Sequence, residues 1–234
     1  MTIGQREFRD YPRPSLAVDP AILTVRDGKL WTLLWRRQNP PQEGTWALPG
    51  VFVNERESLE AAVARGLLAK ANVRDVMHIE QLLTWNKMNR DPRGWVVTVA
   101  YFALVPAAQL LEAVEGREHV GLFALDVKVG SIAGARVFRV DGKLIKPAFD
   151  HADILGAVVR RLRDKLWQST VALALLPEKF TLREMQLVYE AILGEQLNKD
   201  SFRRRVMKTQ RIIEPTGEFQ ENVGHRPPEL FTGV

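Results

Sequence analysis

The last third of the chain carries helix start and stop signals that few folds can accommodate. Thr181 and Glu184 form a capping-box pattern, and apolar residues then recur on one helical face as far as Ile192. Gly194 ends this helix, and Asn198 is a suitable N-cap for a second one over 199–210. Residues 211–231 then predict a hairpin. This part therefore has two short helices followed by a β-ribbon.

The second of these helices is strongly basic. Its inner face is Phe202 and Val206, while Arg204, Lys208 and Arg211 are spaced to share an outer face. A helix, turn, helix and hairpin is the order of a winged helix-turn-helix domain, whose second helix enters the DNA major groove. Most charge runs are solvated surface, but this context favours double-stranded DNA as partner. The predicted DNA-binding residues are Lys199, Ser201, Arg203, Arg204, Arg205, Lys208, Arg211 and, in the wing, Arg226.

The first 150 residues mix strands with few helices. Apolar runs on either side of Asp27-Gly28 predict a hairpin over 16–37, and 95–105 is a continuous apolar strand of the kind found in buried sheets. Strands are also expected at 76–85, 120–125 and 135–145, and helices at 57–70 and 106–116. This pattern predicts an α/β/α sandwich over 1–150. A helix over 151–167 then links it to the winged-helix part, which gives a second domain over 151–234.

Residues 48–73 resemble a Nudix box whose metal-binding residues have been replaced. Glu57 and Arg65 match the pattern, whereas Val51 stands where its first glycine belongs. The three later glutamates are replaced by Gly66, Ala69 and Lys70. Nudix enzymes need carboxylate oxygens to hold Mg²⁺, and glycine, alanine and lysine supply none. We therefore expect no catalytic residues, no metal site and no required cofactor. The simplest alternative is that 57–70 is only an amphipathic helix, and a box helix must pack in the same way.

Nearly the whole chain resembles the Nudix-related transcriptional regulators of NAD biosynthesis, the NrtR-like family. The resemblance rests on Trp46-Ala-Leu-Pro-Gly50, Arg90-Asp-Pro-Arg-Gly94, the strings 149–155 and 180–194, and Phe202-Arg-Arg-Arg-Val206. It implies a homodimeric repressor of NAD synthesis or salvage genes that binds a palindromic operator. It also implies that ADP-ribose or a related nucleotide is sensed by the degenerate Nudix domain. Two alternatives stay open: an ADP-ribose pyrophosphatase, and a regulator of this build that senses another metabolite such as a sugar.

A diphosphate held without metal needs cations and hydrogen-bond donors. Arginine suits this role because its planar fork makes paired hydrogen bonds to phosphate, and the resemblance places three arginines near the pocket. Arg65 is expected instead to pair with Glu57 and hold the box loop. Aromatic rings at 46, 52 or 85 are candidates for stacking on adenine, and His151 either touches the ligand or caps the linker helix. The predicted ligand-binding residues are Arg36, Arg37, Trp46, Phe52, Glu57, Arg65, Lys70 and Arg93.

Composition narrows the compartment. The 234 residues include no cysteine, so disulfides and thiolate chemistry are excluded. No apolar run approaches the ~20 residues needed to span a bilayer, and the N-terminus lacks a signal-type apolar core. The sequence therefore predicts a cytoplasmic protein with no membrane partner.

Overall fold

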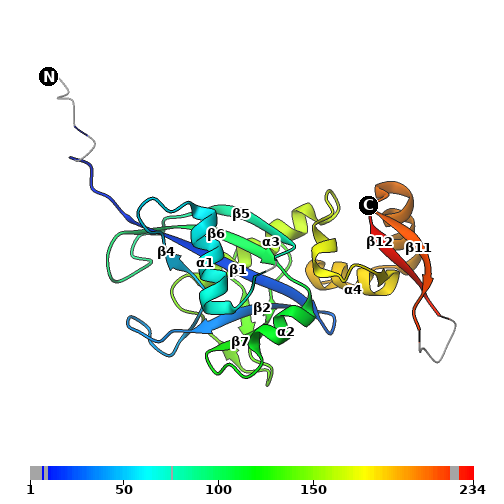
Figure 1. The fold of residues 1–234 in the computed structure, drawn as a ribbon, viewed down its shortest axis with the longest axis horizontal. Coiled ribbons are helices and arrows are strands. Elements are labelled where there is room, and N and C mark those ends of the chain that lie inside the picture. The colour runs from blue at the N-terminus through cyan, green and yellow to red at the C-terminus, as the bar shows by residue number, and fades with distance from the viewer. Residues whose placement is uncertain (1–6, 8–9, 75, 222–226) are drawn as a thin grey trace.

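The computed structural model describes residues 7, 10–74, 76–221 and 227–234 (Figure 1). The predicted wing contact Arg226 lies outside these ranges. The described chain has two parts, a large sheet covered by helices and a smaller helical part with a β-ribbon, coloured from yellow to red in Figure 1.

Residues up to 150 form the mixed α/β part predicted from sequence. The hairpin about Asp27-Gly28 is present, with Asp27 and Gly28 both at positive φ, as a tight turn requires. The elements are β1 (Ser15–Arg26), β2 (Lys29–Arg36), β3 (Trp46–Ala47), β4 (Val51–Phe52), α1 (Leu59–Gly66), β5 (His78–Trp85), β6 (Val96–Leu104), α2 (Ala107–Val114), β7 (Val120–Asp126), β8 (Arg136–Phe138) and β9 (Leu144–Ile145). The strand expected over 135–145 is thus two short strands joined by a turn.

The strands form a nine-stranded mixed sheet in the order β5-β6-β1-β2-β7-β8-β9, with β3 paired to β2 and β4 to β1. β1 runs parallel to β6 and antiparallel to β2, so the long strands β1 and β6 lie at its centre. β6 is buried along nearly its whole length, as its continuous apolar sequence predicts.

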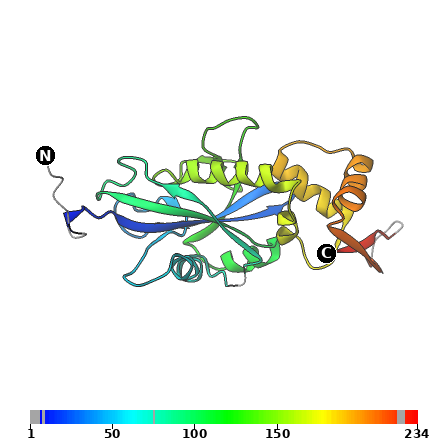
Figure 2. The same cartoon turned by 90° about the horizontal axis from the view of Figure 1, so that it is seen from above.

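Helices cover both faces of the sheet, which confirms the α/β/α sandwich (Figure 2). On one face, α1, a π-helical continuation over Leu67–Ala71, and α2 pack on side chains such as Val18, Ile22 and Leu33. On the other face lies α3 (His151–Leu166), whose Ile154, Val158 and Leu162 belong to the same core as the strands. The linker helix therefore packs on the sheet along its length.

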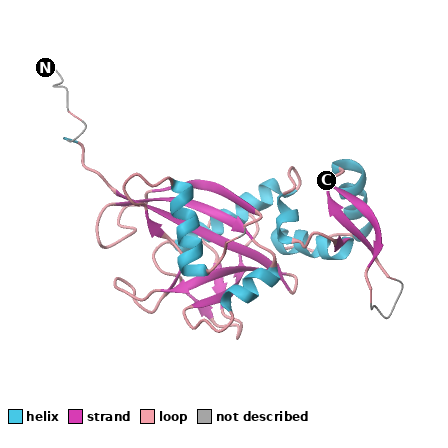
Figure 3. Cartoon of the chain, in the orientation of Figure 1, coloured by secondary structure: helices cyan, strands magenta, loops and turns pink. Residues whose placement is uncertain are grey.

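The C-terminal part has the winged-helix order. Its elements are a 3-10 turn (Val171–Leu175), β10 (Phe180–Thr181), α4 (Leu182–Leu193), α5 (Lys199–Arg204) with a π-helical continuation (Arg205–Gln210), β11 (Ile213–Phe219) and β12 (Glu229–Gly233). The capping box of α4 is complete: Glu184 N–H donates to Thr181 Oγ1 at 3.2 Å, and Thr181 N–H to the Glu184 carboxylate at 2.7 Å. β12 lies between β10 and β11 in a three-stranded sheet. Figure 3 shows this ribbon beside the two helices.

The two parts share one apolar core, because α4 packs on α3 and on β2. Arg163 of α3 ties them further, since its guanidinium donates to the carbonyls of Val127 and Ile192, each at 2.8 Å. In the described part of the chain, no helix is both long and apolar enough to cross a membrane.

Candidate functional site

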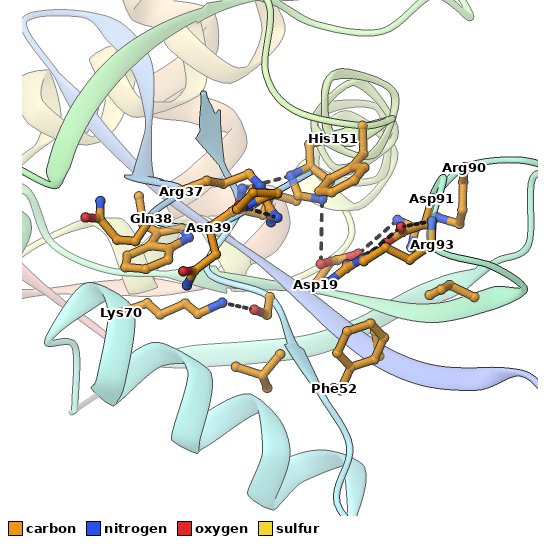
Figure 4. Close-up of a pocket in the computed structure, with 18 of the residues that line it drawn as sticks. Asp19, Arg37, Gln38, Asn39, Phe52, Lys70, Arg90, Asp91, Arg93 and His151 are labelled. Atoms are coloured by element: carbon orange, nitrogen blue, oxygen red, sulfur yellow. Dashed lines mark hydrogen bonds and ion pairs between the residues drawn. The ribbon is translucent and has the colours of Figure 1, made fainter. Parts of the chain in front are cut away.

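A cavity of about 480 Å³ opens at the edge of the sheet where β1, the ends of β2 and β4, the loop before β6 and the start of α3 converge (Figure 4). Its size is in the range of small-molecule sites. Five residues predicted from sequence line it, namely Arg37, Phe52, Arg65, Lys70 and Arg93. His151, which was expected either to contact the ligand or to cap the linker helix, lines it too.

Lys70 stands at a position where the box pattern has a metal-binding glutamate. Its ammonium donates to the carbonyl of Gly50 and lies 4.9 Å from the centre of the Trp35 ring. Burial, together with the nearby Arg37, Arg65 and Arg93, lowers the pKa of Lys70 to about 8, while Asp19 opposes them. The pocket therefore presents a desolvated cation that has much to gain from an anionic ligand.

The other two replaced positions cannot supply a metal ligand, because one has no room for a side chain and the other has no side-chain oxygen. Gly66 packs against the chain so closely that a Cβ there would lie 2.8 Å from the carbonyl oxygen of Pro49. Ala69 is exposed and offers no ligand. Among the described residues, no group of three or more histidines and carboxylates is placed to hold a metal ion. The donors in this box do not fit the oxygen-rich shell that Mg²⁺ requires.

Arg65 and Glu57 form the predicted pair. Arg65 Nε and Nη2 donate to the two Glu57 oxygens at 2.7 and 2.8 Å, and Nη2 also donates to the Phe52 carbonyl at 2.8 Å. Glu57 accepts from Asn54 N–H as well, and these hydrogen bonds hold the pKa of Glu57 at about 2. The pair closes the loop between β4 and α1, so Glu57 braces the box and does not itself line the cavity.

Arg37 and Arg93 face the cavity from two loops. Arg37 donates to the carbonyls of Pro41 and Asn39, and its guanidinium carbon lies 4.8 Å from the Phe149 ring centre. Arg93 lies 5.1 Å over Phe52 and makes a paired hydrogen bond to Asp91. Each guanidinium is thus held by aromatic and polar contacts without losing access to the cavity.

Besides Glu57, two predicted ligand residues do not line the cavity. Arg36 donates to the Gly44 carbonyl at 3.0 Å, and Trp46 packs on Phe123 with ring centres 4.8 Å apart. The aromatic residues that do line the cavity besides Phe52 are Trp35 and Phe149. A strand alternates its side chains, so residues 35 and 37 share a face and residue 36 points away. The same alternation would have identified Trp35 as a cavity residue from the sequence, because it lies two residues before Arg37.

A buried ionic cluster lies against the floor of the cavity, and two of its members, Arg90 and Asp19, line the cavity. Arg90, with 5% of its side chain exposed, donates to Asp19 on β1 at 3.0 Å and to both oxygens of Asp150 at 2.8 and 3.0 Å. Leu48 N–H donates to His151 Nδ1 at 2.9 Å. Gly50 is required here, because a Cβ would lie 1.9 Å from Asp19 Oδ1. Asp19 is a site residue that was not predicted from the sequence, although a carboxylate inside the apolar run of β1 is a visible signal.

The predicted DNA-binding helix is presented to solvent. The turn before it is fixed by Glu190, which accepts from Gln186 and from Leu197 N–H at 2.8 and 2.9 Å. All seven predicted DNA-binding residues that the structure describes are exposed: Lys199, Ser201, Arg203, Arg204, Arg205, Lys208 and Arg211. Residues 205–210 are π-helical, and Arg211 is the C-cap, with φ of 54°. The face that Arg204, Lys208 and Arg211 would share on an unbroken α-helix therefore does not include Arg211.

Arg205 has a structural contact that the spacing did not reveal. Its guanidinium carbon lies 3.7 Å from the ring centre of Trp167, the C-cap of α3. Trp167 packs in turn on Tyr189 and Phe202. Arg205 therefore fastens the basic helix to the end of the linker helix.

We expect Arg205→Ala to lower the free energy of unfolding by about 1 kcal/mol, the scale of a partly desolvated cation–π contact. The slope of log K for DNA binding against log salt should stay close to that of the wild type, because no phosphate contact is lost. A slope reduced by about 0.9, the contribution of one phosphate contact, would show that Arg205 contacts phosphate instead.

The chain is similar in sequence and in structure to several known proteins. Residues 172–232 match the NrtR DNA-binding winged helix domain, and residues 16–135 match the NUDIX domain. The "ADPR responsive transcriptional repressor NtrR" of Acinetobacter baylyi is 36% identical over 98% of this chain and 86% of that protein. The crystal structure of Shewanella oneidensis NrtR complexed with a 27mer DNA has a TM-score of 0.78 and 34% identity, covering 94% of this chain and 93% of that one. An ADP-ribose pyrophosphatase of Methanocaldococcus jannaschii is 31% identical over 66% of this chain and 79% of that protein.

Proposed function

We propose that this chain is a transcriptional repressor controlled by ADP-ribose, because it belongs to the NrtR family of winged-helix regulators with a Nudix domain. The relative from Acinetobacter baylyi, similar over nearly the whole chain, is named for both properties. The observation that carries the proposal is a cavity with Arg37, Lys70 and Arg93 on its walls, in one chain with an exposed basic helix. The resemblance to this family extends the proposal to NAD synthesis or salvage genes as the targets.

The proposed division of labour follows the two parts. Residues 1–150 bind the effector, and 151–234 supply the linker helix and the DNA-binding domain. Two copies of the chain would place two basic helices on a palindromic operator, because half-site spacing mirrors the symmetry of a dimer. His151 begins α3 at the cavity and Trp167 ends it at the basic helix, about 24 Å away at 1.5 Å per residue. An effector that binds two positions of α3 with different affinity would alter DNA binding.

The effector is bound and not cleaved in this proposal. Gly66, Ala69 and Lys70 stand in place of the box glutamates, and an ammonium in the cavity repels a divalent cation while it attracts diphosphate. The likeness to an ADP-ribose pyrophosphatase favours hydrolysis as the second candidate. Incubation with ADP-ribose and Mg²⁺ or Mn²⁺ separates the two, because AMP release is expected only from the enzyme.

The decisive experiment is a DNA-binding titration. A DNA site is selected from a random-sequence library with the full chain, and its affinity is measured by fluorescence anisotropy with and without ADP-ribose. A change in affinity of tenfold or more, within the usual range of coupling energies, supports the proposal. No change with ADP-ribose, in a protein that binds its selected DNA, contradicts it.

The affinity for ADP-ribose should depend on pH through Lys70. Lys70 is charged below its pKa of about 8 and neutral above it. A diphosphate beside the ammonium raises that pKa, so binding takes up a proton above pH 8 and the affinity falls by up to about tenfold per pH unit there. Below pH 8 the affinity should be flat. The guanidinium groups around Lys70, those of Arg37, Arg65 and Arg93, keep their charges across this window.

Isothermal titration calorimetry between about pH 7 and about pH 9 measures this effect. The matched control is Lys70→Arg, which keeps its charge throughout and should bind with little pH dependence. An equal loss of affinity in Lys70→Arg would assign the pH dependence to another group.

A further inference from the structure

The floor of the cavity holds a hydrogen-bond donor and acceptor that face one another without bonding. His151 Nδ1 accepts from Leu48 N–H, so in the neutral ring the proton is on Nε2. Burial lowers the pKa of His151, which keeps the ring neutral. Asp19 Oδ2 is taken by Arg90, while Oδ1 lies 3.7 Å from His151 Nε2, beyond hydrogen-bond range. Figure 4 shows the two side chains pointing toward each other.

Both atoms belong to rigid, buried side chains. His151 and Asp19 are 5% and 8% exposed, and both line the cavity. Within the described part of the chain, Asp19 Oδ1 accepts no hydrogen bond. A gap of 3.7 Å is too narrow for an oxygen to lie between the two atoms, so a ligand oxygen ~2.8 Å from each must lie to one side of the line that joins them, on the cavity side. That oxygen must accept from Nε2 and donate to Oδ1 at once.

We infer that His151 and Asp19 together bind a hydroxyl group of the effector's ribose. A hydroxyl both donates and accepts, whereas a phosphate oxygen or carbonyl only accepts and an ammonium only donates. The Asp19 carboxylate also repels phosphate, so the diphosphate lies toward Lys70, Arg37 and Arg93. The cavity is thereby specific for a diphosphate that also carries a free hydroxyl group. This inference rests on the proposed function, since ADP-ribose is such a ligand.

The test is calorimetry of the full-length protein with two probes, ADP-ribose and inorganic pyrophosphate. Asp19→Asn leaves one oxygen for Arg90 and turns the amide nitrogen toward Nε2, so two donors face the hydroxyl. Affinity for ADP-ribose should fall about tenfold, the value of one hydrogen bond to a charged group. Affinity for pyrophosphate should stay equal or rise, because a negative charge has left the cavity. A change of charge alone would strengthen both ligands, so the opposite signs identify the hydroxyl contact.

Asp150→Asn is the matched control. It makes the same change of size and charge and removes the other carboxylate of Arg90, but Asp150 does not line the cavity. Its ADP-ribose affinity should not fall. An equal fall there would assign the effect to Arg90 and overturn the inference, as would an Asp19→Asn protein that binds ADP-ribose as well as wild type.

His151→Phe decides the matter if Asp19→Asn does not fold. It removes the ring N–H and should weaken ADP-ribose while sparing pyrophosphate; unchanged ADP-ribose binding overturns the inference. A wild type that binds pyrophosphate but no ADP-ribose overturns the proposed effector as well. A wild type that binds ADP-ribose, with variants that bind it equally, overturns only the hydroxyl contact.

Discussion

Replacing Arg204 and Lys208 by alanine should weaken binding to DNA of any sequence by about 30-fold per protomer at about 0.15 M salt. Both side chains are exposed on the basic helix. Each phosphate contact contributes about 0.9 to the slope of log K against log salt, so two lost contacts reduce the slope by about 1.8. The folded state should be little affected, because the aromatic contacts of the helix belong to Phe202 and Arg205.

Anisotropy titrations at several salt concentrations measure both quantities. The control is Lys143→Ala with Lys146→Ala, two exposed lysines that flank β9 in the large sheet and carry the same total charge. That protein should keep the wild-type salt slope. Equal losses in both double variants would show that net charge matters and that the basic helix has no special role.

The sequence was most informative where a local signal needs no partner. The capping box at Thr181, the stop at Gly194 and the Asp27-Gly28 turn are decided by neighbours in the chain, and the structure has all three where they were expected. The continuous apolar run over 95–105 likewise predicted a buried strand, and β6 is buried along nearly its whole length. Such local agreement is what a foldable sequence requires.

The cavity was less predictable because its residues meet only in three dimensions. Asp19, Arg90 and His151 come from a strand, a loop and a helix, and nothing in their spacing reveals that they share one cluster. Arg205 illustrates the same limit, since its position in a run of arginines gives no sign of the Trp167 ring beneath it. Trp46 does not line the cavity but packs on Phe123. From the sequence alone, a tryptophan close to a site can belong either to the core or to the residues that contact the ligand.

Lys70→Glu should abolish regulation by ADP-ribose, with a loss of effector affinity of at least a hundredfold. Reversing the charge removes an attraction and adds a repulsion, and at an effective dielectric of about 20 each unit charge about 4 Å from a phosphate contributes about 4 kcal/mol before screening. A hundredfold loss requires only about 2.8 kcal/mol. Lys70→Met, neutral and of similar length, should lose about tenfold, and Lys70→Arg should remain close to wild type.

DNA binding without effector reports whether these variants fold, and it should be retained, because Lys70 and the basic helix lie in different parts of the chain. Mg²⁺ should not rescue ADP-ribose binding by Lys70→Glu. One carboxylate does not make a metal site, and a second at position 66 would meet the Pro49 carbonyl, where even a Cβ is only 2.8 Å away. AMP release by Lys70→Glu with Mg²⁺ would contradict this and show that the box needs a single glutamate to act. No AMP release is the expected result, because Lys70→Glu binds ADP-ribose poorly and position 66 has no room for a second carboxylate.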